Sequence, residues 1–314
     1  MPHPFLSLHN PSSLPATLAN PVVAIGNFDG VHRGHRHVMG KALEQARALG
    51  RPAAVLTFDP HPRAFLRPDL PQFELTPIDV QADLIAALGM DGLIVLSFNA
   101  AFASLSADGF IRDILVAQLG ISGAVVGWDF HFGKGRAGTP ASLTAAGTAH
   151  GFAVTVLDPL ASGDAPVSST RIRQALTAGD LDTANSLLGY EWFVRGGVIH
   201  GEKRGRDLGY PTANMALTPG CGLKHGVYAV RARVDGATYS AVASFGRRPM
   251  FDNGAPLLET HLFEFRGDLY GKTIDIAFVR YLRPEMTFTG LDALIAQMDR
   301  DSGDARRILA APKI

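Results

Sequence analysis

The sequence has a single cysteine, Cys221, in 314 residues. One thiol cannot form an internal disulfide, and it cannot supply a zinc site made of cysteines alone. The chain also lacks an excess of either charge, since 29 Lys and Arg residues balance 29 Asp and Glu residues. This balance excludes a broadly basic protein that binds nucleic acid.

Long apolar runs are absent as well. The two long stretches without charge, Met1–Phe28 and Ala137–Leu157, are interrupted by Pro, Ser, Thr, Gly, Asn or His. Neither stretch reads as a membrane span. The first twenty residues lack the positively charged region of a secretory signal. We therefore expect a soluble, cytoplasmic protein with no membrane contact.

The first half of the chain alternates short apolar runs with helix-like segments. Continuous apolar runs of this length are typical of strands that are buried on both faces of a parallel sheet. Together with the intervening helices they predict a doubly wound α/β domain, which binds ligands at the carboxyl ends of its strands. The predicted strands are Val22–Ile25, Ala53–Phe58, Leu93–Phe98, Ala124–Val126 and Ala153–Leu157, with helices over His35–Leu49, Leu84–Leu88 and Phe110–Leu119.

The second half has closely spaced strands without intervening helices. Such a pattern predicts an antiparallel β-barrel. A final helix follows it, with Thr289 and Asp292 as a candidate capping box. We place the domain boundary at 187–188, which gives a first domain of residues 1–187 and a second of residues 188–314. The predicted strands are Phe193–Ile199, Gly226–Val234, Tyr239–Ser244, Leu257–Phe265 and Ile274–Tyr281.

A glycine-rich segment, Gly26–His35, joins the first predicted strand to the first predicted helix. Its glycines let the backbone approach a phosphate, and the helix N-terminus adds unpaired N–H donors. His32 and His35 are three residues apart, so one helical turn can present both to the same ligand. Taken alone, the segment is equally consistent with a turn that carries two exposed histidines.

A second polar segment, Val167–Arg173, lies at the start of a predicted helix over Arg171–Ala178. Its hydroxyl groups and its two guanidinium groups can clamp a polyphosphate. Taken alone, it is more consistent with an ordinary helix cap flanked by solvated arginines.

The two segments together resemble the HxGH and S-S/T-x-x-R motifs of nucleotidylyltransferases. With Thr57–Pro62 and Val126–Gly133 they resemble the FMN adenylyltransferase module of the bifunctional bacterial riboflavin kinase/FAD synthetase family. The resemblance implies that the FMN phosphate attacks the α-phosphorus of ATP and expels pyrophosphate, without an enzyme nucleophile. It implies catalytic roles at the phosphates for His32 and His35, and substrate or nucleotide contacts for Asn27, Phe28, Asp29, Gly34, Asp129, Ser169, Thr170 and Arg173.

A loop in the second half, Gly201–Asn214, combines glycines, cations and small polar side chains. Oxygen ligands such as those of Thr212 and Asn214 suit Mg²⁺ held on substrate phosphates. From composition alone, a solvated basic turn explains this segment better. A nearby segment, Gly267–Thr273, imitates a P-loop but is one residue short and leads into a strand.

The Gly205–Asn214 string closely resembles the riboflavin kinase signature, and segments downstream match that family in the same order. The resemblance implies that Glu259 is the general base for the riboflavin 5′-hydroxyl. It implies Mg²⁺ at Thr212 and Asn214, with ATP as co-substrate and FMN and FAD as product and substrate. The implied binding residues are Gly201, Arg206, Gly209, Pro211 and Arg248.

Two departures from the family pattern lie in one loop, where Ser244 replaces Asn and Met250 replaces Thr. We expect kinase activity with an altered flavin affinity. Two alternatives stay open: an adenylyltransferase whose second domain only binds flavin, and a flavin-sensing regulator that has kept the fold. The resemblance implies riboflavin, FMN, FAD and ATP as ligands, and no protein partner is predicted from the sequence.

Overall fold

The computed structural model describes residues 4–70, 72–163, 165–200, 209–218, 220–247 and 256–310. Contacts between residues divide the chain into two compact units, Met1–Ser169 and Thr170–Ile314. The boundary at 187–188 stays a prediction. Across the described ranges, no helix combines the length and the apolar character needed to cross a bilayer.

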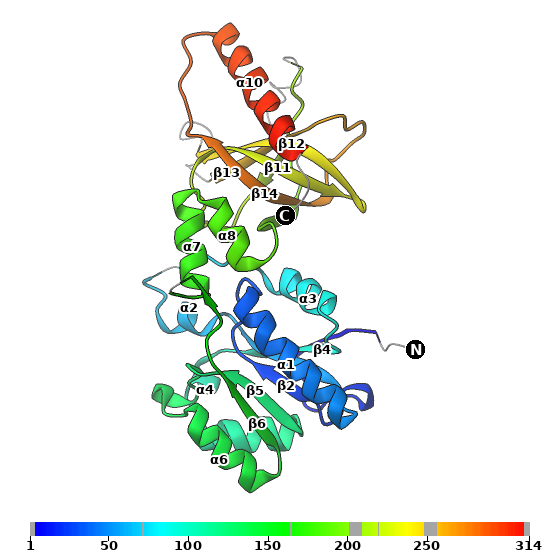
Figure 1. Cartoon of the computed structure of the whole chain (residues 1–314), viewed down its shortest axis with the longest axis vertical. Helices are drawn as coiled ribbons and strands as arrows, with labels where there is room; N and C mark the ends of the chain where they lie inside the picture. Colours follow the sequence, from blue (N-terminus) through cyan, green and yellow to red (C-terminus); the bar gives the residue numbers. More distant parts are fainter. Residues whose placement is uncertain are drawn as a thin grey trace. The chain divides into compact units, whose positions relative to one another are not determined.

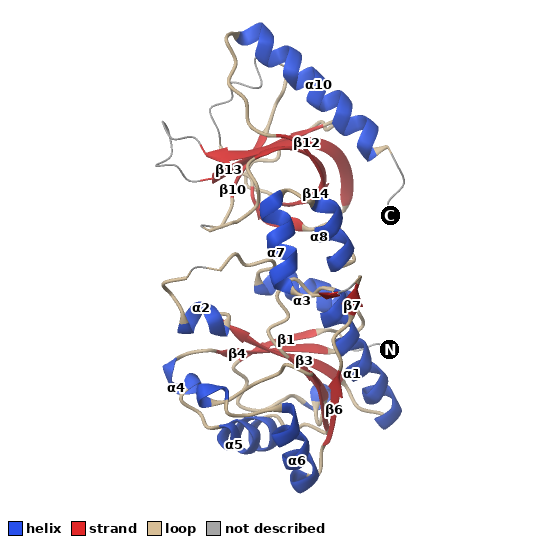
Figure 2. Cartoon of the chain, turned by 60° about the vertical axis from the view of Figure 1, so that its left-hand side comes forward, coloured by secondary structure: helices blue, strands red, loops and turns tan. Residues whose placement is uncertain are grey.

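The first unit is built on a six-stranded parallel sheet with the order β1-β4-β3-β2-β5-β6 (Figures 1 and 2). The five strands that the sequence predicts are all present. The strands are β1 (Leu6–His9), β2 (Val22–Ile25), β3 (Ala53–Asp59), β4 (Gly92–Ser97), β5 (Gly123–Gly127) and β6 (Ala153–Leu157), followed by a short hairpin of β7 (Ala161–Ser162) and β8 (Ala165–Pro166).

Helices cover both faces of this sheet, as the doubly wound pattern predicts. Along β2, Val22 and Ala24 pack in one apolar cluster with α1 and α3, while Val23 and Ile25 pack in another with η2 and α6. The helices of the unit are η1 (Ala16–Leu18), α1 (Arg33–Leu49), α2 (Pro62–Leu66), α3 (Ile78–Ala87), α4 (Ala100–Ala103), α5 (Ala107–Gly109), the π-helix η2 (Phe110–Gln118), η3 (Lys134–Arg136) and α6 (Pro140–His150).

The edge strand β1 is an element that the sequence analysis missed. It pairs in parallel with β4, where Leu6 lies opposite Gly92. Added to Gly92, a Cβ would approach a methyl group of Leu18 to 2.9 Å and the Leu6 carbonyl oxygen to 3.1 Å. This close approach explains why residue 92 is a glycine. The residues that approach it, Leu6 and Leu18, are far from Gly92 in the sequence, so no local pattern indicates the contact.

The second unit contains a six-stranded antiparallel sheet with the order β10-β13-β12-β11-β14-β9. A bridge between Ile199 and Asn214 joins the two ends of the sheet, which confirms the predicted barrel. The four-residue strand β10 was not predicted. The elements are α7 (Ser169–Ala178), α8 (Leu181–Leu188), β9 (Phe193–Gly197), β10 (Ala213–Ala216), β11 (Gly226–Val234), β12 (Ala237–Arg247), β13 (Pro256–Leu262), β14 (Thr273–Arg283) and α10 (Leu291–Leu309).

Buried aromatic side chains form much of the barrel core. Trp192 stacks on Phe278 with ring centroids 5.3 Å apart, and Tyr228 meets Phe278 edge-on at 5.1 Å. All three side chains are almost completely buried. Large rings of this kind supply most of the apolar area that a small barrel can bury.

The C-terminal helix α10 forms as predicted, but its N-terminus differs from the prediction. The N-cap residue is Gly290, which makes no side-chain capping bond, so the expected capping box at Thr289 is wrong. Helix entry one residue later removes Thr289 from the capping position. Asp292 still lies in the first turn, where a carboxylate interacts favourably with the helix dipole.

Candidate functional site

The first candidate site begins at the carboxyl end of β2 and continues into the N-terminus of α1. His32 is the N-cap of α1, and its Nδ1 accepts a hydrogen bond from the His35 main-chain N–H at 3.2 Å. An accepting Nδ1 carries no proton, so the neutral ring holds its proton on Nε2. The capping bond thereby makes Nε2 the ring nitrogen that carries the proton in neutral His32.

The structure brings His32 and His35 together. Their rings stack with centroids 3.5 Å apart and planes 18° from parallel, and Phe28 meets the His35 ring edge-on at 5.3 Å. His32 is 4% exposed. The predicted pair is therefore an ordered arrangement and not two solvated side chains on a turn.

The loop between β2 and α1 holds an unusual backbone conformation. Phe28 and Val31 have positive φ angles of 51° and 37°, and Gly30 lies between them with φ 90°. Residues other than glycine rarely adopt this region, and a β-branched residue there is strained. Such a conformation persists where the surrounding structure holds it in place.

A buried polar network around Asp29 holds this loop. The Oδ1 atom of Asp29 accepts hydrogen bonds from the main-chain N–H groups of Leu75 and Thr76, at 2.9 and 3.0 Å. The Thr76 hydroxyl lies 3.4 Å from the same oxygen and accepts from the Gly30 N–H at 2.8 Å. Asp29 is 4% exposed, so its carboxylate ties the loop to the segment before α3.

Other motif residues of the first unit surround the same loop. The Ser169 hydroxyl donates to the main-chain carbonyl of Asp29 at 2.9 Å, and the Thr57 hydroxyl donates to that of Asn27 at 3.1 Å. A Cβ on Gly34 would lie 3.1 Å from the His32 ring and 3.6 Å from the Val167 carbonyl oxygen. Three segments that are far apart in sequence therefore meet at the N-terminus of α1.

The second candidate site lies on the barrel, where three strands place polar residues opposite one another. Asn214 of β10 pairs with Glu259 of β13, and Glu259 pairs with Ser244 of β12. Residues directly opposite in antiparallel strands have side chains on the same face, with Cβ atoms about 5 Å apart. The predicted base, a predicted metal ligand and the substituted serine are thus neighbours.

The amide of Asn214 is buried beside Glu259. Asn214 is 5% exposed, and its Oδ1 atom has no hydrogen-bond partner in the part of the chain that the structure describes. A buried amide oxygen without a donor is costly, because its desolvation is not compensated. This atom is therefore available to a cation or to another ligand group.

The segment Gly209–Thr212, which leads into β10, is held from two directions. Gly209 has φ 82°, which glycine adopts readily. The ring of His261 contacts the Pro211 carbonyl oxygen through Nδ1 at 2.9 Å, and the Tyr210 hydroxyl donates to Asp299 of α10. Burial, followed by the bond to Asp299, raises the pKa of Tyr210 above its usual value. This phenol therefore stays protonated and can donate throughout the neutral range.

Comparisons with known proteins address both sites. A family model for FAD synthetase matches residues 14–171, and a model for riboflavin kinase matches residues 188–309. The curated bifunctional riboflavin kinase/FMN adenylyltransferase of Listeria monocytogenes is 40% identical over 307 residues, which cover 96% of this chain and 97% of that protein. The chain belongs to the bifunctional riboflavin kinase/FMN adenylyltransferase family.

Further relatives in the family have a similar degree of identity. The proteins of the same name from Pseudomonas fluorescens and from Escherichia coli strain K12 are 41% and 38% identical. They cover 93% and 98% of this chain, and the alignments cover 93% and 97% of those proteins. The crystal structure of a macrolide-efflux protein from Streptococcus pneumoniae matches 96% of this chain and 99% of its own, with a TM-score of 0.84 and 29% identity.

The contacts described above do not test the roles of several further residues that the family resemblance implies. Thr170 and Arg173 lie on α7, which belongs to the second compact unit. Asp129 is exposed, on the loop after β5. Gly201, Arg206 and Arg248 lie outside the described residues, as does Met250. The roles of all these residues stay predictions.

The sequence analysis missed a cluster of phenylalanines in the adenylyltransferase unit. Phe58 lies one residue before the end of β3 and meets Phe98, Phe102 and Phe110, with centroids 5.5 to 6.4 Å apart. Phe110 in turn contacts Phe132 at 5.4 Å. The cluster lies at the carboxyl ends of β3, β4 and β5, the edge where doubly wound sheets bind ligands. Its members are far apart in the sequence, so their aromatic character was the one sequence signal that could have indicated the cluster.

Proposed function

We propose that this chain phosphorylates riboflavin to FMN with ATP in its barrel unit and adenylylates FMN to FAD in its parallel-sheet unit. One observation supports this proposal above all: the FAD synthetase model matches the first part of the chain and the riboflavin kinase model matches the second. In each part, motif residues lie close together. The domain assignment 1–187 for adenylyl transfer and 188–314 for kinase activity is part of the proposal.

For adenylyl transfer, the residues at the N-terminus of α1 act by positioning and by stabilising charge. An oxygen of the FMN phosphate attacks the α-phosphorus of ATP, and the bond to the β-phosphate oxygen breaks to release pyrophosphate. His32 Nε2 donates to a phosphate oxygen, as the tautomer set by the capping bond allows. The N-terminal end of the α1 dipole favours the same negative charge.

The phenylalanine cluster and Trp128 support a flavin as the substrate of this unit. Trp128 is 54% exposed directly after β5, and Phe58 lies one residue before the end of β3, which β2 separates from β5. Aromatic faces stack favourably on a planar ring system. The exposed Trp128 and the partly exposed Phe58, Phe98 and Phe102 suit FMN better than a substrate that is polar throughout.

For the kinase reaction, Glu259 accepts the proton of the riboflavin 5′-hydroxyl as its oxygen attacks the γ-phosphorus of ATP. The bond to the β-phosphate oxygen breaks, and ADP leaves. A positioned carboxylate of this kind contributes about 10²- to 10⁴-fold to the rate. The position of Glu259 between Asn214 and Ser244 supports this role.

The residues beside Glu259 fit a hard cation. Asn214 offers a buried amide oxygen that receives no donor among the described residues, and Thr212 offers a half-buried hydroxyl two residues earlier. These two side chains would hold Mg²⁺ together with the phosphates of ATP. When bound, the ion offsets negative charge on the transferring phosphoryl group.

A time course with riboflavin, ATP and Mg²⁺ tests the proposal, with the flavins separated by chromatography. We expect FMN to appear first and FAD to follow. FAD formed from supplied FMN, with no FMN formed from riboflavin, would favour the rival enzyme whose barrel only binds flavin. This rival is considered because Ser244, which departs from the family pattern, lies opposite Glu259. Stoichiometric flavin binding without ATP turnover would favour the regulator.

The remaining ligand and location assignments are predictions of the same proposal. We expect ATP to be the co-substrate of both reactions, and riboflavin, FMN and FAD to be the flavin ligands. No nucleic-acid partner is expected from the balanced charge. A cytoplasmic location stays a prediction.

A further inference from the structure

Glu259 belongs to a row of opposite residues that crosses five strands of the barrel. Beyond Ser244 the row continues to Val227 of β11, and Val227 lies opposite Arg283 of β14. Opposite residues share a face of the sheet. Arg283 is therefore the last Cα partner in this row. Because the register shifts between Val227 and Tyr228, the face of the Arg283 side chain is set by its contact with Asp301 of α10 and not by the pairing alone.

Helix α10 lies against this face, but few apolar contacts attach it. Its apolar contacts come from its C-terminal half, where Ala305 and Leu309 pack with Ala229 and Phe263. None of the residues from Leu291 to Arg300 is buried. Buried apolar packing thus fixes the C-terminal end of α10, and the direction of the rest of the helix across the sheet depends on other contacts.

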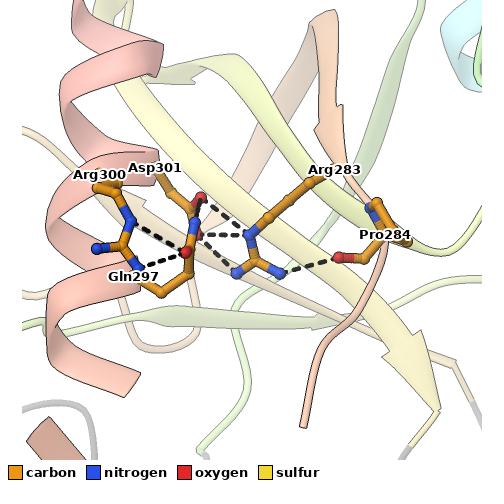
Figure 3. Close-up of polar contacts among 5 residues, drawn as sticks. All are labelled: Arg283, Pro284, Gln297, Arg300 and Asp301. Carbon is orange, nitrogen blue, oxygen red and sulfur yellow. Dashed lines mark hydrogen bonds and ion pairs between the residues drawn. The ribbon is translucent and has the colours of Figure 1, made fainter. Parts of the chain in front are cut away.

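An ion pair between Arg283 and Asp301 of α10 provides one such contact (Figure 3). Arg283 Nε lies 2.9 Å from Asp301 Oδ1, and Arg283 Nη2 lies 2.7 Å from Oδ2. Gln297 donates to Asp301 Oδ1 at 2.8 Å, and Arg283 Nη1 donates to the Pro284 carbonyl at 2.9 Å. The two-point contact fixes the direction of the guanidinium group as well as its distance.

This ion pair is nearly buried, since the side chains of Arg283 and Asp301 are 17% and 8% exposed. Buried ion pairs add little net stability, because desolvation of the charges offsets their attraction. Their best-attested use is to specify one arrangement of packed elements. The Arg283–Asp301 ion pair is therefore expected to set the position of α10 and to add little to the free energy of unfolding.

The opposite flank of α10 contacts the segment that precedes β10. The Tyr210 hydroxyl donates to Asp299, which is two residues from Asp301. Two residues correspond to about 200° around a helix, so Asp299 and Asp301 point to opposite sides. Helix α10 thus links β14 to the segment Gly209–Thr212, which carries a proposed Mg²⁺ ligand.

We propose that Arg283 and Asp301 are positioning residues of the riboflavin kinase reaction. Their ion pair fixes α10 across the face that bears Glu259, and α10 in turn holds Gly209–Thr212 through Tyr210. The inference rests on the proposed roles of Glu259, Thr212 and Asn214. The pair does not contact the reacting atoms.

Replacement of both charges by apolar side chains separates positioning from stability. The variant Arg283→Met/Asp301→Leu keeps the bulk of both side chains and removes the desolvation cost, so its midpoint of thermal unfolding should equal or exceed that of the wild type. We expect kcat for FMN formation to fall about tenfold or more, because α10 no longer holds Gly209–Thr212 in place through Tyr210. Adenylylation of supplied FMN, measured in the same samples, should change less than about twofold.

Matched variants complete the experiment. Asp304→Asn makes the same kind of change on α10 at an exposed pair with Arg307, and it should leave both activities unchanged. Arg283→Lys keeps the charge and loses the two-point contact, so kcat should fall in this variant also. A wild-type kcat in the apolar double variant overturns the inference; if that variant does not fold, a wild-type kcat in Arg283→Lys overturns it.

The variant Glu259→Gln distinguishes an error in the positioning role of the ion pair from an error in the proposed kinase site. If Glu259→Gln keeps full kinase activity, the assignment of the base is wrong. If Glu259→Gln is inactive and both pair variants keep the wild-type kcat, only the positioning role is wrong.

Discussion

The Ser169 hydroxyl donates a hydrogen bond of 2.9 Å to the main-chain carbonyl of Asp29, a residue 140 positions away in the sequence. This bond joins the hydroxyl-rich motif at the start of α7 to the glycine-rich loop after β2. Because Asp29 is also held by Leu75 and Thr76, one loop is connected to two distant segments. The strained backbone at Phe28 and Val31 is thereby kept in the form that places His32 at the helix N-terminus.

Removal of the Asp29 carboxylate should release this loop. In Asp29→Ala the buried N–H groups of Leu75 and Thr76 lose their acceptor, which costs about 2 kcal/mol or more of unfolding free energy. FMN adenylylation should fall more than about tenfold while riboflavin phosphorylation is retained. Urea unfolding and separate assays of the two reactions measure these effects.

The matched control for this change is Asp108→Ala. The Asp108 carboxylate is 75% exposed and pairs with Arg112 on the surface of the same unit. Its loss should change stability by less than about 1 kcal/mol and leave adenylylation unchanged. Wild-type adenylylation in Asp29→Ala would contradict the positioning role of Asp29.

Two substitutions at His32 should separate its capping role from its chemical role. Asparagine is a favoured N-cap residue, so His32→Asn should keep the cap of α1 while removing Nε2. We expect adenylylation to fall about 100-fold or more with little change in stability. His32→Ala should lose about 1 kcal/mol in addition, measured by urea unfolding. Full activity in His32→Asn would exclude Nε2 as a phosphate donor.

The variant Glu259→Gln should stop FMN formation without affecting FAD formation from FMN. Glutamine keeps the shape of the side chain but cannot take the proton of the riboflavin hydroxyl, so the rate should fall about 10²-fold or more. Chromatography of the flavins in both assays measures the split. Equal losses in both reactions would indicate a folding defect and not the loss of a base.

Ser244 is directly opposite Glu259, so its side chain is placed to influence substrate binding there. The family resemblance implies asparagine at this position. We expect Ser244→Asn to lower the KM for riboflavin severalfold, because an added amide supplies about one more hydrogen bond. The kcat should stay close to that of the wild type. An unchanged KM would mean that residue 244 does not contact the flavin.

Helix α8 should contribute a pH-dependent part of the stability of the second unit. Asp180 caps this helix by accepting from the Thr183 N–H at 3.0 Å, and the side-chain and main-chain bonds to Thr183 lower its pKa below 3.8. A lowered folded-state pKa means that the contribution is present above about pH 3.8 and is lost as the pH falls through the folded-state pKa.

The variant Asp180→Ala tests this contribution. It should be less stable than the wild type by about 1 kcal/mol at pH 7, and the difference should shrink in strong acid. Urea unfolding at several pH values measures it. A constant difference at all pH values would show that the carboxylate charge does not contribute.

Local sequence patterns determined most elements of both units. The five apolar runs of the first half became β2 to β6. Strands β2 to β5 are mainly buried, and a strand buried on both faces needs apolar residues at every position, whereas the edge strand β6 is partly exposed, contrary to the prediction. The helix after the glycine-rich loop begins at Arg33, next to the His32 cap that the motif contains. Signals of this kind act within a few residues, so they can be recognised in the sequence alone.

The tertiary structure alone decided which distant groups meet. Strand order brings Leu75 and Thr76 to Asp29, and strand register places Ser244 beside Glu259. The same register sets Arg283 in the row of the proposed base, and the packing of α10 brings Asp301 to it. No local pattern specifies these pairs, because hydrogen bonds and ion pairs between distant segments depend on the assembled fold and not on spacing along the chain.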